Sequence, residues 1–351
     1  MLQRLREDMS AHGGAYVLAV LLLIGAGFTP LPYVRSAPGS TYNALGSIEG
    51  KPLVTIATSA AYPTYDTTGK IQILTVSQWG GPYGTLTWPD ALRSLLDSSI
   101  YIIPSKFLFS DRDTGDAVEE EGQIQFASAQ SSAIGAAFGY LDIPVDQSTS
   151  VIFINKESPN RKLLKVGDRI LEAADVPIAT ADDFGKVMST LKPGSTLPVV
   201  VLRNNKQKSL TLTTYALPKE TRSRVGVVLM VEYEPPMDVT FALSDVGGPS
   251  AGVAFAVSLV EKLTKEDLLR GRNVAMTGEI SGSGQVGAIG GMPQKMAAAV
   301  RNGATLMLFP RANCPISASL VPPELTIVPV DTLSEAIEAL RLKDSTKYPT
   351  C

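Results

Sequence analysis

The chain has 351 residues, which is long enough for two or three domains and a buried core. Charged residues make up 19% of it and the formal net charge is -3, so the composition argues against a large basic face for nucleic acid. One histidine and two cysteines nearly exclude a structural zinc site, which needs four such ligands or carboxylate substitutes. We therefore expect no metal and no cofactor.

An uncharged segment, residues 13–34, lies near the N-terminus. As a helix it would be about 33 Å long and could cross a bilayer. Arg4 and Arg6 precede it, which favours residues 1–12 on the cytoplasmic side. The alternative is a cleaved signal peptide, because the strictly apolar part is close to signal length. Either interpretation predicts export, and a retained anchor predicts a single-pass protein of the cell membrane with an extracytoplasmic body.

Residues 35–142 are predicted to form a β-rich membrane-proximal region. Gly, Pro, Ser and Thr are frequent in its first half, and strand-like runs occur at residues 53–57 and 71–76. Residues 124–141 are mostly small and rich in Ala, Ser and Gln, which favours a helix packed closely against a neighbour. No residue of this region indicates a particular chemistry.

Residues 143–217 combine strand-like runs with one segment of helical spacing, residues 181–191. Two predicted strands, 197–203 and 209–214, are joined by a hairpin-type turn. At Leu164-Lys-Val-Gly-Asp-Arg-Ile170 this segment resembles a PDZ domain of the kind found in bacterial proteases. The resemblance implies that it binds extended peptide ends by adding a strand to a sheet edge.

Residues 218–342 read as an α+β domain with its own core, followed by a C-terminal tail, residues 343–351. Cys314 and Cys351 could form a disulfide in an oxidising compartment, and the alternative is two free thiols. The predicted strands are 225–231, 273–280, 304–309 and 325–330, and the predicted helices are 250–263, 293–302 and 333–342.

Ser250 stands at the start of a predicted helix, after a tight glycine turn. Residues 248–252 formally match G-x-S-x-G, the nucleophile elbow of α/β-hydrolases, which requires a later histidine. The chain contains a single histidine, His12, and it lies before the uncharged segment. A serine-histidine-acid triad in the body of the protein is therefore excluded, and a nucleophilic Ser250 needs another base.

Lys295 is the candidate base. It lies near the start of a helix that follows Gly290 and Gly291, where the positive helix end disfavours an ammonium group. Its neighbours in sequence are apolar, and desolvation lowers a lysine pKa further. For Ser250 or Lys295 taken alone, an ordinary helix residue is the competing interpretation.

At these positions the sequence resembles the proteolytic domain of Lon-type serine-lysine peptidases. The matching pieces are Gly248-Pro-Ser-Ala-Gly252, Met276-Thr-Gly-Glu-Ile280, Gly284-Gln-Val-Gly-Ala-Ile-Gly-Gly291 and Lys295. The resemblance implies that Ser250 is the nucleophile and Lys295 its general base. It also implies supporting roles for Thr277, whose hydroxyl would orient the lysine amine, and for Gly248 and Ala251 beside the serine.

The order of these segments resembles the membrane-anchored PDZ-Lon proteins of bacteria. Lon enzymes carry an ATPase, yet no G-x-x-x-x-G-K-[ST] loop occurs in this sequence. The predicted fold class is α+β, with an N-terminal transmembrane helix, a β-rich region, a PDZ-like domain and a Lon-type proteolytic domain. The implied function is ATP-independent cleavage of unfolded or flexible protein segments by a homo-oligomer, and the alternative is a membrane-anchored peptide-binding adaptor whose Lon-like domain is catalytically silent.

Overall fold

The computed structural model describes residues 17, 25, 27–110, 113–217, 220–244, 246–342 and 345–351. The chain divides into two compact units, each assembled from segments that are distant in sequence. The smaller unit comprises residues 1–41, 74–120 and 290–302, and the larger unit comprises residues 42–73, 121–289 and 303–351.

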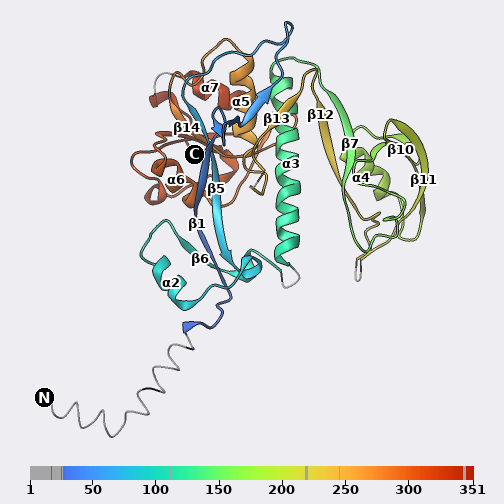
Figure 1. Cartoon of the computed structure of the whole chain (residues 1–351), viewed down its shortest axis with the longest axis horizontal. Helices are drawn as coiled ribbons and strands as arrows, with labels where there is room; N and C mark the ends of the chain where they lie inside the picture. Colours follow the sequence, from blue (N-terminus) through green and yellow to red (C-terminus); the bar gives the residue numbers. More distant parts are fainter. Residues whose placement is uncertain are drawn as a thin grey trace, which may run out of the picture. The chain divides into compact units, whose positions relative to one another are not determined.

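The smaller unit contains most of two long strands, β1 (Tyr33–Asn43) and β5 (Lys70–Gly80). They are neighbours in the strand order β18-β17-β14-β5-β1-β6, and Figure 1 shows them side by side. The short strand β6 (Tyr101–Pro104) pairs with β1 in an antiparallel register. The helices of this unit are α2 (Trp88–Ser94) and α6 (Met292–Arg301), and its 3-10 turns are η1 (Gly81–Tyr83) and η2 (Ser105–Phe107).

The predicted transmembrane helix is not found. Among the residues that the structure describes, no helix is long and apolar enough to cross a membrane. Residues 1–16, 18–24 and 26 lie outside the described residues. The described end of the predicted span is not helical, because Pro30 and Pro32 cannot continue a helix and β1 begins at Tyr33. The predicted fold class and the predicted single-pass location in the cell membrane are therefore wrong on this point.

The larger unit contains a parallel sheet, in place of the segregated strands that an α+β class implies. β14 (Asn273–Met276) lies between β17 (Leu306–Pro310) and the first residues of β5, and β17 also pairs with β18 (Thr326–Val330). All three of these pairings are parallel. Every residue of β17 is buried, as is typical of a parallel strand covered on both faces. This half of the molecule thus has mixed α/β character.

Helix α5 (Gly252–Leu263) is the centre of the core of the larger unit, and its residues from Gly252 to Glu261 are all buried. It packs against α7 (Leu333–Arg341) and against α3 (Gly115–Tyr140). Phe126 of α3 meets Phe255 of α5 edge to face, with ring centroids 5.7 Å apart. The remaining short elements here are β2 (Ser47–Ile48), β3 (Lys51–Pro52), β4 (Val54–Ile56), β13 (Val239–Phe241), β15 (Glu279–Ile280), β16 (Val286–Gly287), η3 (Arg311–Asn313), η4 (Ala318–Leu320) and η5 (Ser345–Lys347).

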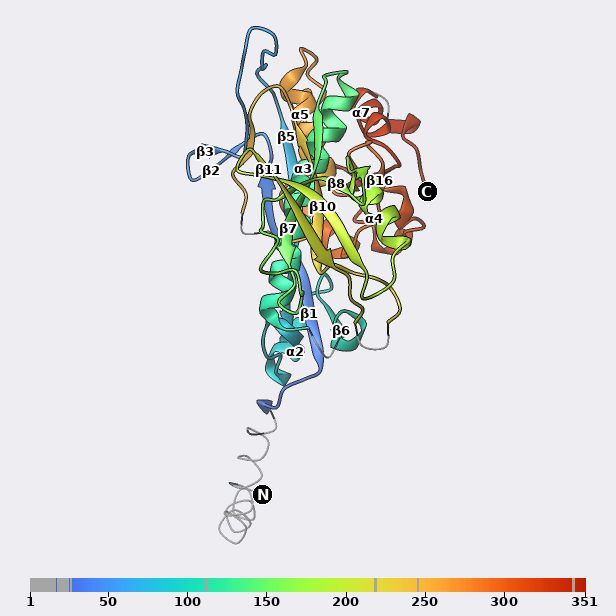
Figure 2. The ribbon, with the colours of Figure 1, turned by 90° about the vertical axis from the view of Figure 1, so that its right-hand side faces the viewer.

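A second sheet in the larger unit is antiparallel, with the strand order β11-β10-β8-β7-β12, and has its own hydrophobic core. The outer strand β12 pairs with β7 from one end of β7 to the other. This edge of the sheet is therefore formed by a strand that comes after β11 in the sequence. Figure 2 shows helix α4 beside this sheet. The elements are β7 (Asp146–Ile154), β8 (Arg169–Ala173), β9 (Val176–Pro177), α4 (Ala181–Ser189), β10 (Thr196–Arg203), β11 (Lys206–Thr213) and β12 (Val227–Glu234).

A disulfide joins Cys314 to Cys351, with a Cα–Cα distance of 5.5 Å. It ties the C-terminal residue to the segment that follows β17. Arg311, three residues before Cys314, donates a hydrogen bond to the Thr350 carbonyl. The C-terminal end of the described chain is thus held against the larger unit by a covalent link and a polar contact.

Candidate active site

Ser250 lies in the turn that leads into α5, two residues before the helix begins at Gly252. Gly248 has φ of +88°, a left-handed conformation that favours glycine. Its N–H donates to the Gly122 carbonyl of α3 at 2.8 Å, which fixes the turn against that helix. Ser250 is partly exposed, whereas the following Ala251 is buried. The local sequence thus presents the serine at the surface of a rigid turn.

Thr277 lies directly behind this turn, where the chain passes from β14 to β15. Its side chain is fully buried, and its hydroxyl donates to the Ser250 carbonyl at 3.2 Å. The Gly278 N–H donates to the same carbonyl at 2.9 Å, and the Val253 N–H donates to the Gly278 carbonyl at 3.1 Å. The fold therefore places Thr277 next to Ser250, and its hydroxyl contacts the backbone carbonyl of Ser250.

Close contact between α5 and β15 requires Gly252. A Cβ atom at this position would lie 2.8 Å from Ile280 Cγ2 and 3.0 Å from the Ile280 backbone nitrogen. Both distances are too short for an unstrained contact, so glycine allows the helix start to approach the strand. The positions of Ser250 and Ile280 are consequently coupled by packing.

Lys295 lies on α6, which belongs to the smaller unit. The helix follows Gly291, whose φ is +70°, and the Lys295 N–H donates to the Gly291 carbonyl at 2.9 Å. Lys295 is only 3% exposed. Burial lowers the pKa of its amine from 10.5 to about 7, because a charged ammonium is poorly solvated there. Near neutral pH, a large fraction of this amine is therefore able to accept a proton.

The predicted site residues thus fall into two groups. Gly248, Ser250, Ala251 and Thr277 occur together in the larger unit, and Lys295 occurs in the smaller one. The pairing of the serine with the lysine, and the action of Thr277 on the lysine amine, remain predictions. Within the described ranges, no cluster of three or more His, Cys, Asp or Glu residues could hold a metal ion.

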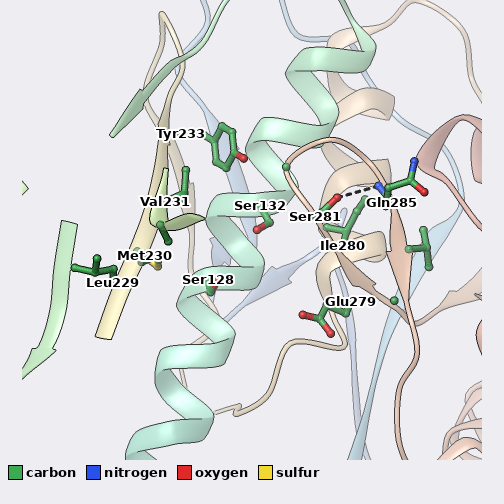
Figure 3. A pocket seen from close by; sticks show the side chains of 14 residues that line it. Ser128, Ser132, Leu229, Met230, Val231, Tyr233, Glu279, Ile280, Ser281 and Gln285 are labelled. Carbon is green, nitrogen blue, oxygen red and sulfur yellow. Dashed lines mark hydrogen bonds between the residues drawn. The ribbon is translucent and has the colours of Figure 1, made fainter. Parts of the chain in front are cut away.

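A cavity of about 480 Å³ lies in the larger unit, and it was not predicted from the sequence. Helix α3 contributes Ser128 and Ser132, and Figure 3 shows these two between the side chains of β12 and those of the β15–β16 hairpin. The cavity is lined by Ser128, Ser132, Ala181, Leu229, Met230, Val231, Tyr233, Glu279, Ile280, Ser281, Gly282, Gln285, Val286 and Gly287. The small residues of α3 were the sole sequence signal, since they favour close packing around that helix.

Two parts of the chain match known protein families. Residues 244–342 match the Lon protease (S16) C-terminal proteolytic domain, and residues 125–214 match the PDZ domain. The strands and helices that carry the predicted site residues and line the cavity fall within the first of these matches, apart from α3, α4 and β12.

Similar sequences include Lon proteases from several organisms. The chain is 35% identical over 161 residues to the Lon protease of Xanthomonas oryzae, an alignment covering 44% of this chain and 18% of that protein. It is 43% identical over 93 residues to the Lon protease of Neorickettsia sennetsu, covering 26% and 11% of the two chains. Lon protease 1 of Myxococcus xanthus is 26% identical over 223 residues, covering 60% and 26%. The chain thus spans about a quarter or less of the length of these relatives.

Solved structures with local similarity include a PDZ domain of an SdrC-like protein from Listeria monocytogenes. It is 20% identical, with a TM-score of 0.23, and the alignment covers 25% of this chain and 90% of that one. The PDZ domain of an SdrC-like protein from Listeria innocua is also 20% identical, with a TM-score of 0.22, covering 23% and 92%.

Proposed function

From a Lon-type proteolytic domain match at residues 244–342 and a PDZ match at residues 125–214, we propose that this chain is a serine peptidase. Its substrates are unfolded or flexible protein segments, Ser250 is its nucleophile and Lys295 is its general base. The observation that carries the assignment of the base is the burial of Lys295, which lowers the pKa of its amine to about 7.

The proposed reaction has two stages. Ser250 Oγ attacks a peptide carbonyl while Lys295 Nζ takes the hydroxyl proton, and the oxyanion is held by backbone amides at the start of α5, beside Ala251. The C–N bond then breaks, and Lys295 gives its proton to the leaving amine. Water hydrolyses the acyl-enzyme, with Lys295 again accepting the proton and Ser250 recovering it. Thr277 and Gly248 position the turn that carries the serine.

Cleavage by this chain is proposed to be independent of ATP, because the sequence contains no phosphate-binding loop of the Walker type. Flexible segments are the substrates that such an enzyme can cut, since no motor in the chain would unfold a stable domain. The PDZ match supports a peptide-binding role for the antiparallel sheet, either in recruiting chain ends or in regulating access to the site.

The test is to incubate the full chain with an unfolded reporter protein in the absence of ATP. Wild-type protein should cleave it, and Ser250→Ala and Lys295→Ala should each lose at least about a hundredfold in kcat, because a nucleophile or a general base is removed. Lys186→Ala, which changes an exposed lysine on α4, is the matched control and should cleave as the wild type does.

A small activated ester separates the peptidase from the adaptor alternative. Mass spectrometry should find an acyl group on Ser250 of the wild-type chain and none on Ser250→Ala. Equal cleavage by all the variants would contradict the assigned roles. Binding of peptides without any acylation of Ser250 would favour a peptide-binding adaptor.

A further inference from the structure

The cavity described above joins the two matched regions of the larger unit. Half of its lining residues, those of α3, α4 and β12, lie outside residues 244–342. The other half form the β15–β16 hairpin, which begins two residues after Thr277. Two residues of extended chain span at most about 7 Å, so the cavity borders the segment that bonds the Ser250 carbonyl.

The backbone at the two sides of the cavity differs in its bonding. On β12, the Val231 carbonyl accepts from Ser131 Oγ at 3.0 Å, and the Tyr233 N–H donates to Ser131 Oγ at 3.2 Å. That edge of β12 is therefore already occupied by α3. On the other side, β15 has one strand partner, β16, within the described chain, and the start of α5 at Gly252 packs against Ile280 on the second edge.

Tyr233 closes the end of the cavity between α3 and the turn of the hairpin. A Cβ atom at Gly135 would lie 2.7 Å from its ring, and one at Gly282 would lie 1.9 Å from its hydroxyl oxygen. The aromatic ring therefore fits because both neighbours are glycines. β12, α3 and the hairpin are packed into one framework around the empty volume.

We propose that this cavity is a substrate subsite, which holds an extended segment of the unfolded polypeptide alongside β15 and leads it to Ser250. The inference rests on the proposed peptidase function. An extended chain would lie along the β15–β16 hairpin and place a side chain in the cavity. Met230 and Val231 offer apolar surface to a substrate side chain.

The charge at the subsite selects further among substrates. Glu279 is the one charged side chain among the lining residues, and it is exposed to solvent. A lysine or arginine of the substrate that reaches Glu279 gains a favourable ionic contact, whereas an acidic residue is repelled. The subsite therefore takes extended segments that combine an apolar residue with a basic one.

The experiment fills the cavity from helix α3. Ser132→Phe places a ring in the empty volume, and Ser128→Phe does so one turn earlier. Ala127→Phe makes the same kind of change at an exposed position of α3 that does not line the cavity, and is the matched control. Circular dichroism and thermal unfolding identify any variant that does not fold. If one of the two filling variants fails to fold, the other is used.

Three readouts are compared on the full chain. In a Ser250→Ala background, the Kd for a fluorescein-labelled, reduced and alkylated protein should rise about tenfold with either filling variant and stay unchanged with Ala127→Phe. When Ser250 is kept, either filling variant should raise KM for that protein about tenfold. Acylation of the same variants by a small activated ester should stay at the wild-type rate. Glu279→Gln should remove a several-fold preference for a lysine-containing peptide over its glutamate counterpart.

The outcomes separate the subsite from the peptidase assignment. Unchanged Kd and KM in both filling variants overturn the subsite, whatever the ester shows. If the wild-type chain is not acylated but the filling variants still weaken polypeptide binding, the subsite holds and the peptidase assignment fails. Equal weakening by Ala127→Phe overturns the subsite as well, because the effect would then not depend on the cavity.

Discussion

At the scale of single residues, the candidate site depends on the protonation state of Lys295. A lysine in water is protonated at neutral pH and cannot act as a base. The buried Lys295 has a pKa lowered to about 7, so it exchanges a proton in the range in which a general base is most effective. Ser250, by contrast, needs no perturbed environment beyond a turn that exposes its hydroxyl.

We predict that cleavage of an unfolded substrate rises with pH through about 7. Below that value the amine is protonated, and kcat/KM should fall roughly tenfold for each further pH unit. Above it the rate should reach a plateau. The pH profile of kcat/KM measures this directly, and a rate that stays constant down to pH 5 would show that Lys295 is not the base.

A second buried titratable group, Glu261, lies in the last turn of α5. It is 1% exposed, and its Oε2 accepts a hydrogen bond from the Leu268 N–H at 3.1 Å. Burial raises the pKa of this carboxyl from 4.5 to about 7. The folded chain therefore holds a proton here that the unfolded chain releases between pH 4.5 and 7.

Glu261 should make the protein less stable as pH rises from about 4.5 to about 7, because the folded state must then either keep the proton or bury a charge. The loss approaches roughly 3 kcal/mol above pH 7. Glu261→Gln should remove this contribution, so the variant should gain stability over the wild type at pH 8 and gain little at pH 4.5. Urea unfolding at both pH values checks this, and an equal difference at the two values would count against it.

At the scale of elements, the start of α5 is held in place by two neighbours. Thr277 and Gly278 bond the Ser250 carbonyl, and Gly252 lets the helix lie against Ile280 of β15. The strand predicted at residues 273–280 is in fact two strands separated at Thr277 and Gly278. The Thr277 N–H still donates to the Leu308 carbonyl of β17 at 3.1 Å, while the Thr277 hydroxyl and the Gly278 N–H bond the serine turn.

Gly252→Ala should therefore disturb both stability and catalysis. The added Cβ atom meets Ile280 at 2.8 Å, and relieving such overpacking typically costs about 1–3 kcal/mol. Because the shift moves the Ser250 turn, kcat should fall by about tenfold or more. Gly185→Ala on α4 is the control, since a Cβ atom there meets nothing within 4 Å and should stabilise its helix by up to about 1 kcal/mol. Thermal unfolding and cleavage kinetics of the two variants test the contrast, and similar behaviour of both would refute it.

At the scale of the whole molecule, both compact units are built from segments that are far apart in the sequence. Residues 42–73, assigned from sequence to a separate membrane-proximal region, supply strands of the larger unit, and Lys70–Ile73 of β5 pair in parallel with β14. The parallel sheet thus combines residues 70–73 with strands that begin about two hundred residues later, which implies slow, non-local folding steps.

The resemblance to Lon-type enzymes leads us to predict that the chain assembles into homo-oligomers. Light scattering on the full-length chain should give a mass that is a multiple of 37.2 kDa. A mass that remains at that of one chain across a wide concentration range would disprove it. Ser250→Ala should assemble as the wild type does, because the substitution leaves the packed core unchanged.

The candidate site residues and several helix bounds were predictable from the sequence. The single histidine at position 12 excluded a triad in the body of the protein, and the resemblance to Lon-type peptidases then favoured a serine-lysine site. Helix bounds were predicted to within two residues for α5, α6 and α7, because caps and periodicity act over a few residues. The same reasoning extended residues 13–34 as one helix, although Pro30, Pro32 and strand β1 end it.

Contacts between distant segments became visible only in the folded structure. It brought Thr277 to the carbonyl of Ser250, buried Glu261, placed β1 and β5 in the sheet and formed a cavity from α3, β12 and the β15–β16 hairpin. Hydrophobic periodicity shows which face of an element is buried, but not which element covers it. Packing of that kind is set by the whole chain at once, and the shape of the site therefore emerged from the fold.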